Sequence, residues 1–152
     1  LPMNTADSSL NTSQQPSDFW LGIEQFNQGE YYACHDTLEA IWMDAQTINK
    51  GFYQGILQIS VGLYHLTNLI WQGAAILLGE GIHRLDAYED SYGGINVASF
   101  VEQVIQWLTV LQETGPEQVQ QVANTLLARS GSSENQDSES RQVLPIPHIV
   151  PV

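Results

Sequence analysis

Two residues that could do chemistry, His35 and Glu39, lie four positions apart in the segment EYYACHDTLEAIWMD (residues 30–44), with Trp42 three positions further on. Side chains at positions i and i+4 of an α-helix lie on the same face. An imidazole and a carboxylate placed in this way can ligate one divalent metal ion or act together as acid and base. The function of the chain therefore depends on where this helix face points.

The apolar pattern of the helix predicted over residues 30–45 places His35 and Glu39 on its inner side. At about 100° per residue, four residues fall within about 60° of His35, namely Tyr31, Leu38, Glu39 and Trp42. The solvent side holds Glu30, Thr37 and Asp44, with Asp36 near its edge. We therefore expect His35 and Glu39 to be buried.

The helix predicted over residues 48–70 also carries polar groups beside its apolar face. One arc of this helix holds Gly51, Gly55 and Gly62 together with Gln54, Gln58 and His65. A glycine inside a helix costs roughly 0.5–1 kcal/mol relative to alanine, and close approach of another backbone is the usual reason to keep one. The preceding helix is the expected neighbour. The pattern thus predicts an interior polar cluster around His35 and Glu39.

Three interpretations of this cluster remain open. The first is a structural hydrogen-bond network that satisfies itself. The second is a divalent-metal site with His35, Glu39 and His65 as ligands, supported by Tyr31, Trp42, Gln54 and Gln58. The third is a small-molecule or catalytic pocket. Metal binding is our first functional hypothesis. A non-catalytic scaffold or interaction protein is the alternative, and the residues identify neither a reaction nor a small-molecule ligand.

The elements that must position these residues are all helical. We predict an all-α, antiparallel bundle of about six helices with irregular tails at both ends. Gly29 is expected to end a first helix capped by Ser17 or Asp18, and a fourth helix covers residues 71–88. Asn96 caps the fifth helix, and Pro116 begins the sixth. The expected division is a flexible segment (1–16), a helical-bundle domain (17–130) and a C-terminal tail (131–152).

The C-terminal tail combines a low-complexity stretch, GSSENQDSESRQ, with the proline-rich VLPIPHIVPV. Each residue before a proline is disfavoured in helix. The tail should therefore be extended, and either disordered or pinned against a surface groove. Of these two we favour disorder.

The charge balance limits the classes of partner. The chain has four Lys and Arg residues against seventeen Asp and Glu, a net charge of −13. Such a surface repels nucleic acids and anionic membranes, and the most apolar segment is too polar for a membrane span. A single cysteine, Cys34, excludes an internal disulfide. Together with the lack of a signal-peptide pattern, this favours a cytoplasmic protein. A homo-oligomer is compatible with the sequence.

The segments FNQGEYYACHDTLEAIW and GFYQGILQISVGLYHLTNLIWQGAAILLGEGIHRL resemble the small bacterial and archaeal family catalogued as domain of unknown function 309. The resemblance covers about residues 19–88 and includes the motif H-x-x-x-E-x-x-W at His35, Glu39 and Trp42. It implies an all-helical bundle, no established activity, and a motif suggested to bind metal. Where the family commonly has glutamate after the histidine, this chain has Asp36, which reaches less far.

Overall fold

The computed structural model describes residues 15–131 and 144–152 and is all-α, as predicted. Its helices are α1 (Ser17–Asn27), α2 (Tyr31–Asp44), α3 (Thr47–Thr67), α4 (Trp71–Leu85), α5 (Val97–Thr114) and α6 (Val119–Gly131). A 3₁₀ turn, η3 (Pro116–Gln118), precedes α6. A hairpin of two short strands, β1 (Ser91–Tyr92) and β2 (Ile95–Asn96), joins α4 to α5. The sequence patterns did not predict these strands.

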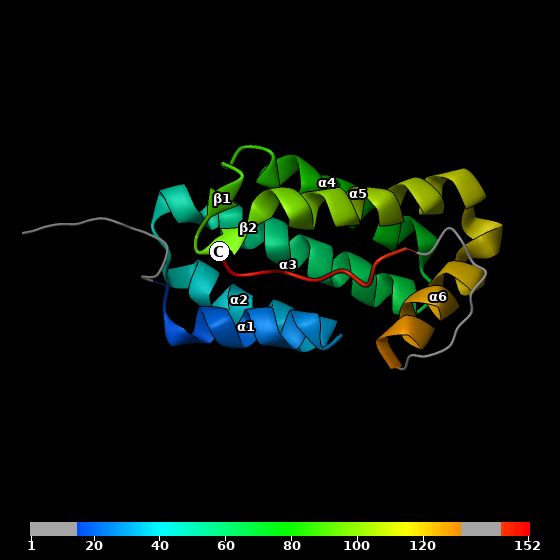
Figure 1. Cartoon of the computed structure of the whole chain (residues 1–152), viewed down its shortest axis with the longest axis horizontal. Coiled ribbons are helices and arrows are strands. Elements are labelled where there is room, and N and C mark those ends of the chain that lie inside the picture. Colours follow the sequence, from blue (N-terminus) through cyan, green and yellow to red (C-terminus); the bar gives the residue numbers. More distant parts are fainter. Residues whose placement is uncertain (1–14, 132–143) are drawn as a thin grey trace, which may run out of the picture.

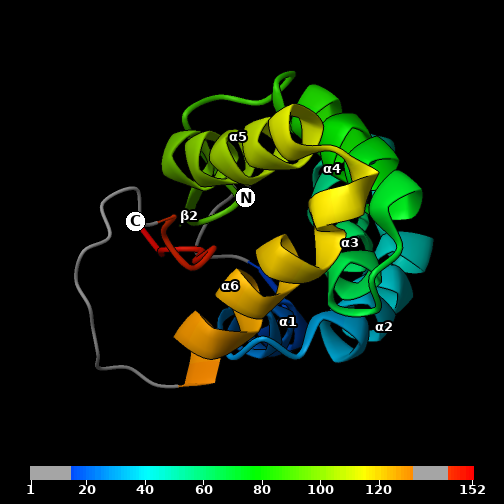
Figure 2. The same ribbon diagram turned by 90° about the vertical axis from the view of Figure 1, so that its right-hand side faces the viewer.

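Helices α1 to α5 follow one another around an arc, each packed against the next (Figures 1 and 2). Helix α6 packs against α3 and α5. A single hydrophobic core fills the space between the helices and includes Phe19, Phe52, Phe100 and Trp107, none of which is exposed. None of the helices in the described part of the chain is both long and apolar enough to cross a membrane.

Several helix ends follow the predicted local signals. Gly29 adopts a φ of 83° after α1, a conformation that glycine reaches without steric cost. The side chain of Asn96 accepts a hydrogen bond from the Ser99 amide and so caps α5, as predicted. The predicted cap of α1 is wrong, because Pro16 occupies the N-cap position and makes no side-chain hydrogen bond.

Gly55 and Gly62 of α3 face α4, and Gly51 faces Tyr88 just beyond it, which corrects the prediction that these glycines would face α2. A Cβ added to Gly55 would lie 2.7 Å from Leu85 Cγ, and one added to Gly62 would lie 2.9 Å from Leu78 Cδ2. Gly81 of α4 stands opposite Gly55, 2.8 Å from its carbonyl oxygen by the same construction. The two helices are close because small residues lie on both sides of their contact.

Residues 144–152 form an extended strap that closes the arc between α5 and α1 (Figure 2). Ile149 is fully buried, and its backbone exchanges two hydrogen bonds with the Asn27 side chain of α1, at 2.8 and 2.9 Å. The indole of Trp107 in α5 donates to the Pro145 carbonyl at 2.7 Å. For these residues the expectation of disorder is wrong, and the pinned alternative is correct. Residues 1–14 and 132–143, which hold the rest of both predicted tails, lie outside the described part.

Candidate functional site

The position of α2 in the arc decides how deeply its polar residues are buried. This helix packs against α1 on one side and α3 on the other, and its buried residues are Tyr31, Cys34 and Leu38. His35 therefore lies at the edge of the buried face, with its side chain 18% exposed, and Glu39 is 55% exposed. The prediction of an interior cluster is wrong, because the buried face of α2 is centred on Cys34, one residue before His35.

His35, Asp36 and Glu39 form a compact group of potential metal ligands on α2. His35 Nδ1 lies 3.2 Å from Asp36 Oδ1, and His35 Nε2 lies 4.0 Å from Glu39 Oε1. One donor atom from each of the three residues lies within 4.8 Å of the others. The Tyr32 ring packs against the imidazole, with ring centroids 5.3 Å apart.

Two members of the group, His35 and Glu39, line a surface pocket of about 510 Å³, whereas Asp36 is not part of its lining. Helix α2 contributes three lining residues to it, α3 contributes four and α4 one: His35, Glu39, Trp42, Lys50, Gly51, Gln54, Leu57 and Arg84. Of the supporting residues predicted from the sequence, Gln54 and Trp42 share this pocket with His35 and Glu39. This volume falls within the range of roughly 300–1,000 Å³ that small-molecule sites occupy.

Two cationic side chains, Lys50 and Arg84, line the same pocket and were not predicted as site residues. The Lys50 ammonium donates to the Trp42 carbonyl at 3.0 Å and lies 4.2 Å from the centroid of the Trp42 ring. Arg84 Nε donates to Gln58 Oε1 at 2.9 Å, and the Gln58 amide donates to Glu80 at 3.0 Å. These bonds hold both cations in place. The available signal in the sequence was the rarity of basic residues, of which there are four.

The other residues predicted for the site lie elsewhere. The Tyr31 ring packs edge-on against Phe26 in the core, 5% exposed, and its hydroxyl has no hydrogen-bond partner among the described residues. Gln58 bonds to α4 and is absent from the pocket lining. His65 lies near the end of α3 against Gly73, and it is not part of the His35 group.

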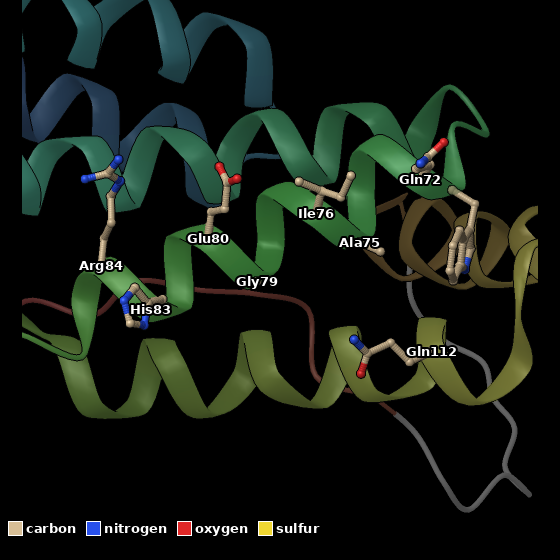
Figure 3. A pocket seen from close by; sticks show the side chains of 9 residues that line it. Gln72, Ala75, Ile76, Gly79, Glu80, His83, Arg84 and Gln112 are labelled. Atoms are coloured by element: carbon tan, nitrogen blue, oxygen red, sulfur yellow. The ribbon is translucent and has the colours of Figure 1, made fainter.

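A second groove, of about 770 Å³, runs between α4 and α5 (Figure 3). Ile76 and His83 of α4 line it together with Gln112 of α5. Arg84 and Glu80 extend from α4 on the side of α3, so Arg84 also reaches the first pocket (Figure 3). Because the first pocket gathers two of the potential metal ligands, His35 and Glu39, and both described cations, it is the better candidate for a functional site.

Comparison with known protein families identifies one segment of the chain. Residues 19–77 match the model of the family described as domain of unknown function (DUF309). The match confirms the resemblance predicted from the sequence for α1, α2, α3 and the beginning of α4, while residues 78–88 lie beyond it. It assigns no activity and no role to the H-x-x-x-E-x-x-W motif. Comparison with curated proteins and with solved structures found no match.

Proposed function

We propose that the pocket beside α2 binds a divalent metal ion through His35, Asp36 and Glu39. The observation that carries this proposal is that the three donor atoms lie within 4.8 Å of one another, and two of the three residues, His35 and Glu39, line an accessible pocket. The DUF309 match does not bear on metal binding, because that family is described only as a domain of unknown function. The ligands predicted from the sequence were His35, Glu39 and His65. Asp36 takes the place of His65 in this proposal, because His65 is not part of the group.

The donor set suits an ion of intermediate hardness. One imidazole nitrogen and two carboxylate oxygens are ligands that zinc, manganese and ferrous iron accept. All three residues come from one helix, so a metal ion would have open positions facing the pocket. A bound ion could there polarise a ligand or activate a water molecule. These three residues do not determine which metal binds or which reaction it would catalyse.

A metal-dependent increase in thermal stability tests the proposal. Protein purified without an affinity tag, stripped with chelator and dialysed, should melt several degrees higher with zinc, manganese or ferrous iron near neutral pH. Since a ligand that binds only the folded state stabilises by about 2.7 kcal/mol at a hundred times its Kd, a specific site gives a saturable shift. The variants His35→Ala and Glu39→Gln should each abolish the shift while remaining folded.

Asp44→Asn is the matched control, because it removes an exposed carboxylate from the same helix outside the group. It should leave the shift unchanged. A shift that persists in Glu39→Gln, or one that Asp44→Asn reduces equally, would mean that ions bind the acidic surface in general. Absence of any shift with all three metals would exclude the site.

The alternative function is a non-catalytic scaffold or interaction protein. The groove between α4 and α5 favours it, because its lining includes Trp71, Ala75 and the half-exposed Ile76, which could pack against a partner, including a second copy of the chain. A purely structural role for the His35 group has less support. Within the described residues, neither His35 nor Glu39 forms a hydrogen bond to another helix. Sedimentation of the purified protein distinguishes a monomer from a self-associating scaffold.

A further inference from the structure

The pocket beside α2 contains two basic side chains, although the chain as a whole is strongly acidic. Of the four Lys and Arg residues, those whose side chains the structure describes are Lys50 and Arg84, and both line the pocket beside α2. Neither lies within 4.0 Å of a carboxylate oxygen in the described part of the chain, although acidic residues outnumber basic ones by seventeen to four. Two cations left without carboxylate partners in one pocket leave their charge available to a ligand.

The hydrogen bonds that Lys50 and Arg84 make to described residues leave other N–H donors of both side chains free. Arg84 uses Nε for Gln58, and no described residue accepts a hydrogen bond from its two terminal nitrogens. That edge of a guanidinium matches the spacing of two oxygens of a carboxylate or phosphate. Lys50 donates to one carbonyl, and its ammonium carries three protons. Trp42 adds apolar surface to the same pocket, whereas Leu57, only 7% exposed, adds little.

We infer that this pocket binds the oxyanion of a small organic molecule, a phosphate ester or a carboxylate, between Arg84 and Lys50. The apolar part of the molecule would lie against Trp42. This inference goes beyond metal binding and does not depend on it, because neither cation belongs to the group of potential metal ligands. Glu39 is the one carboxylate that lines the pocket, and it opposes the anion.

Isothermal titration of metal-free, dialysed protein at low ionic strength tests the inference, with phenyl phosphate and benzoate as probes. At least one probe should bind with a stoichiometry of one, and the comparison of the two shows which oxyanion is preferred. Arg84→Gln and Lys50→Gln should each weaken binding about tenfold, the effect of losing one hydrogen bond to a charged group. Arg84→Lys should recover part of the affinity, because it restores the charge without the paired donors. Glu39→Gln should tighten binding.

Gln121→Glu is the matched control, because it makes the net charge one unit more negative at an exposed position of α6, outside the pocket. It should change the affinity less than twofold, and circular dichroism should show that every variant is folded. Failure of both probes to bind overturns the inference. So does equal weakening by Gln121→Glu and Lys50→Gln, which would reflect general charge. Since the titration contains no metal, either result leaves the metal proposal to its own test.

Discussion

At the scale of single residues, depth of burial separates two adjacent residues of α2, Cys34 and His35. Cys34 precedes His35 and is fully buried, and it accepts a hydrogen bond from the Ser60 hydroxyl at 3.2 Å. His35 lies at the edge of the pocket. A difference of one position along α2 thus separates a buried core thiol from a side chain that lines the pocket.

The Cys34 thiol should make the protein less stable in alkali. Burial raises the pKa of this thiol to about 11, against the small lowering effect of the Ser60 hydrogen bond. A group whose pKa is higher in the folded state contributes stability below its unfolded pKa, and that contribution is lost as pH rises toward the folded value. Stability should therefore fall between about pH 9 and 11, by about 2–3 kcal/mol in total from this group. Urea midpoints measured across this range test the prediction.

Cys34→Ala provides the comparison, because it removes the thiol and leaves the buried tyrosines, whose raised pKa values act in the same direction. The variant should be less stable at pH 8 but should lose less stability on going to pH 10.5. Parallel pH profiles for the two proteins would show that the thiol does not titrate with a raised pKa.

At the scale of elements, the contact between α3 and α4 depends on glycines whose positions are not equivalent. A Cβ on Gly81 would lie 2.8 Å from the Gly55 carbonyl oxygen and 2.5 Å from Ile59 Cγ1, so a backbone would have to shift. Gly81→Ala should destabilise by about 1–3 kcal/mol, the usual cost of overpacking a core. Denaturant midpoints at constant m-value measure this difference.

Gly79 of the same helix is the control position. The nearest atom to an added Cβ there is Leu108 Cδ2 at 3.8 Å, an ordinary contact. Gly79→Ala should therefore stabilise by about 0.5–1 kcal/mol, through the higher helix propensity of alanine. Equal effects of the two substitutions would show that helix propensity, and not the close approach of α3, decides the outcome at Gly81.

The positions of the helices could be predicted from the sequence better than which helices pack against each other, and the reason is physical. Helix ends depend on local chemistry, such as the Asn96 cap and the left-handed turn at Gly29, and these can be recognised in a single segment. The glycines of α3 indicated close packing correctly. They could not indicate the partner, because α2 and α4 are both sequence neighbours of α3. The choice of α4 becomes apparent only when Gly81 is found opposite Gly55.

The candidate site could likewise be predicted from the sequence only in part. The spacing of His35 and Glu39 predicted their shared helix face, and the pocket that they line with Gln54 was partly foreseen. Lys50 and Arg84 belong to different helices and follow no motif. Their convergence depends on how α3 and α4 are packed, which no local pattern contains.

At the scale of the whole molecule, the strap of residues 144–152 connects elements that are far apart in the sequence. Asn27 of α1 bonds to Ile149, and Gln103 of α5 exchanges hydrogen bonds with the His148 backbone. The strap also pairs with the hairpin through Ile95 and Pro151. Proline patterns correctly excluded helix here, but they say nothing of the surface on which an extended chain packs.

Because the strap joins both ends of the arc, Ile149 should stabilise the whole fold. Ile149→Ala should lower the free energy of unfolding by about 2–5 kcal/mol, as for other truncations of buried isoleucine. Chemical unfolding followed by far-UV circular dichroism and by tryptophan fluorescence should give coincident transitions at a lower midpoint, because Trp107 contacts the strap. Val150→Ala, at an exposed position of the same strap, should stay within about 0.5 kcal/mol of the parent. If Ile149→Ala changed stability as little as Val150→Ala, the strap would be an accessory to a bundle that is stable without it.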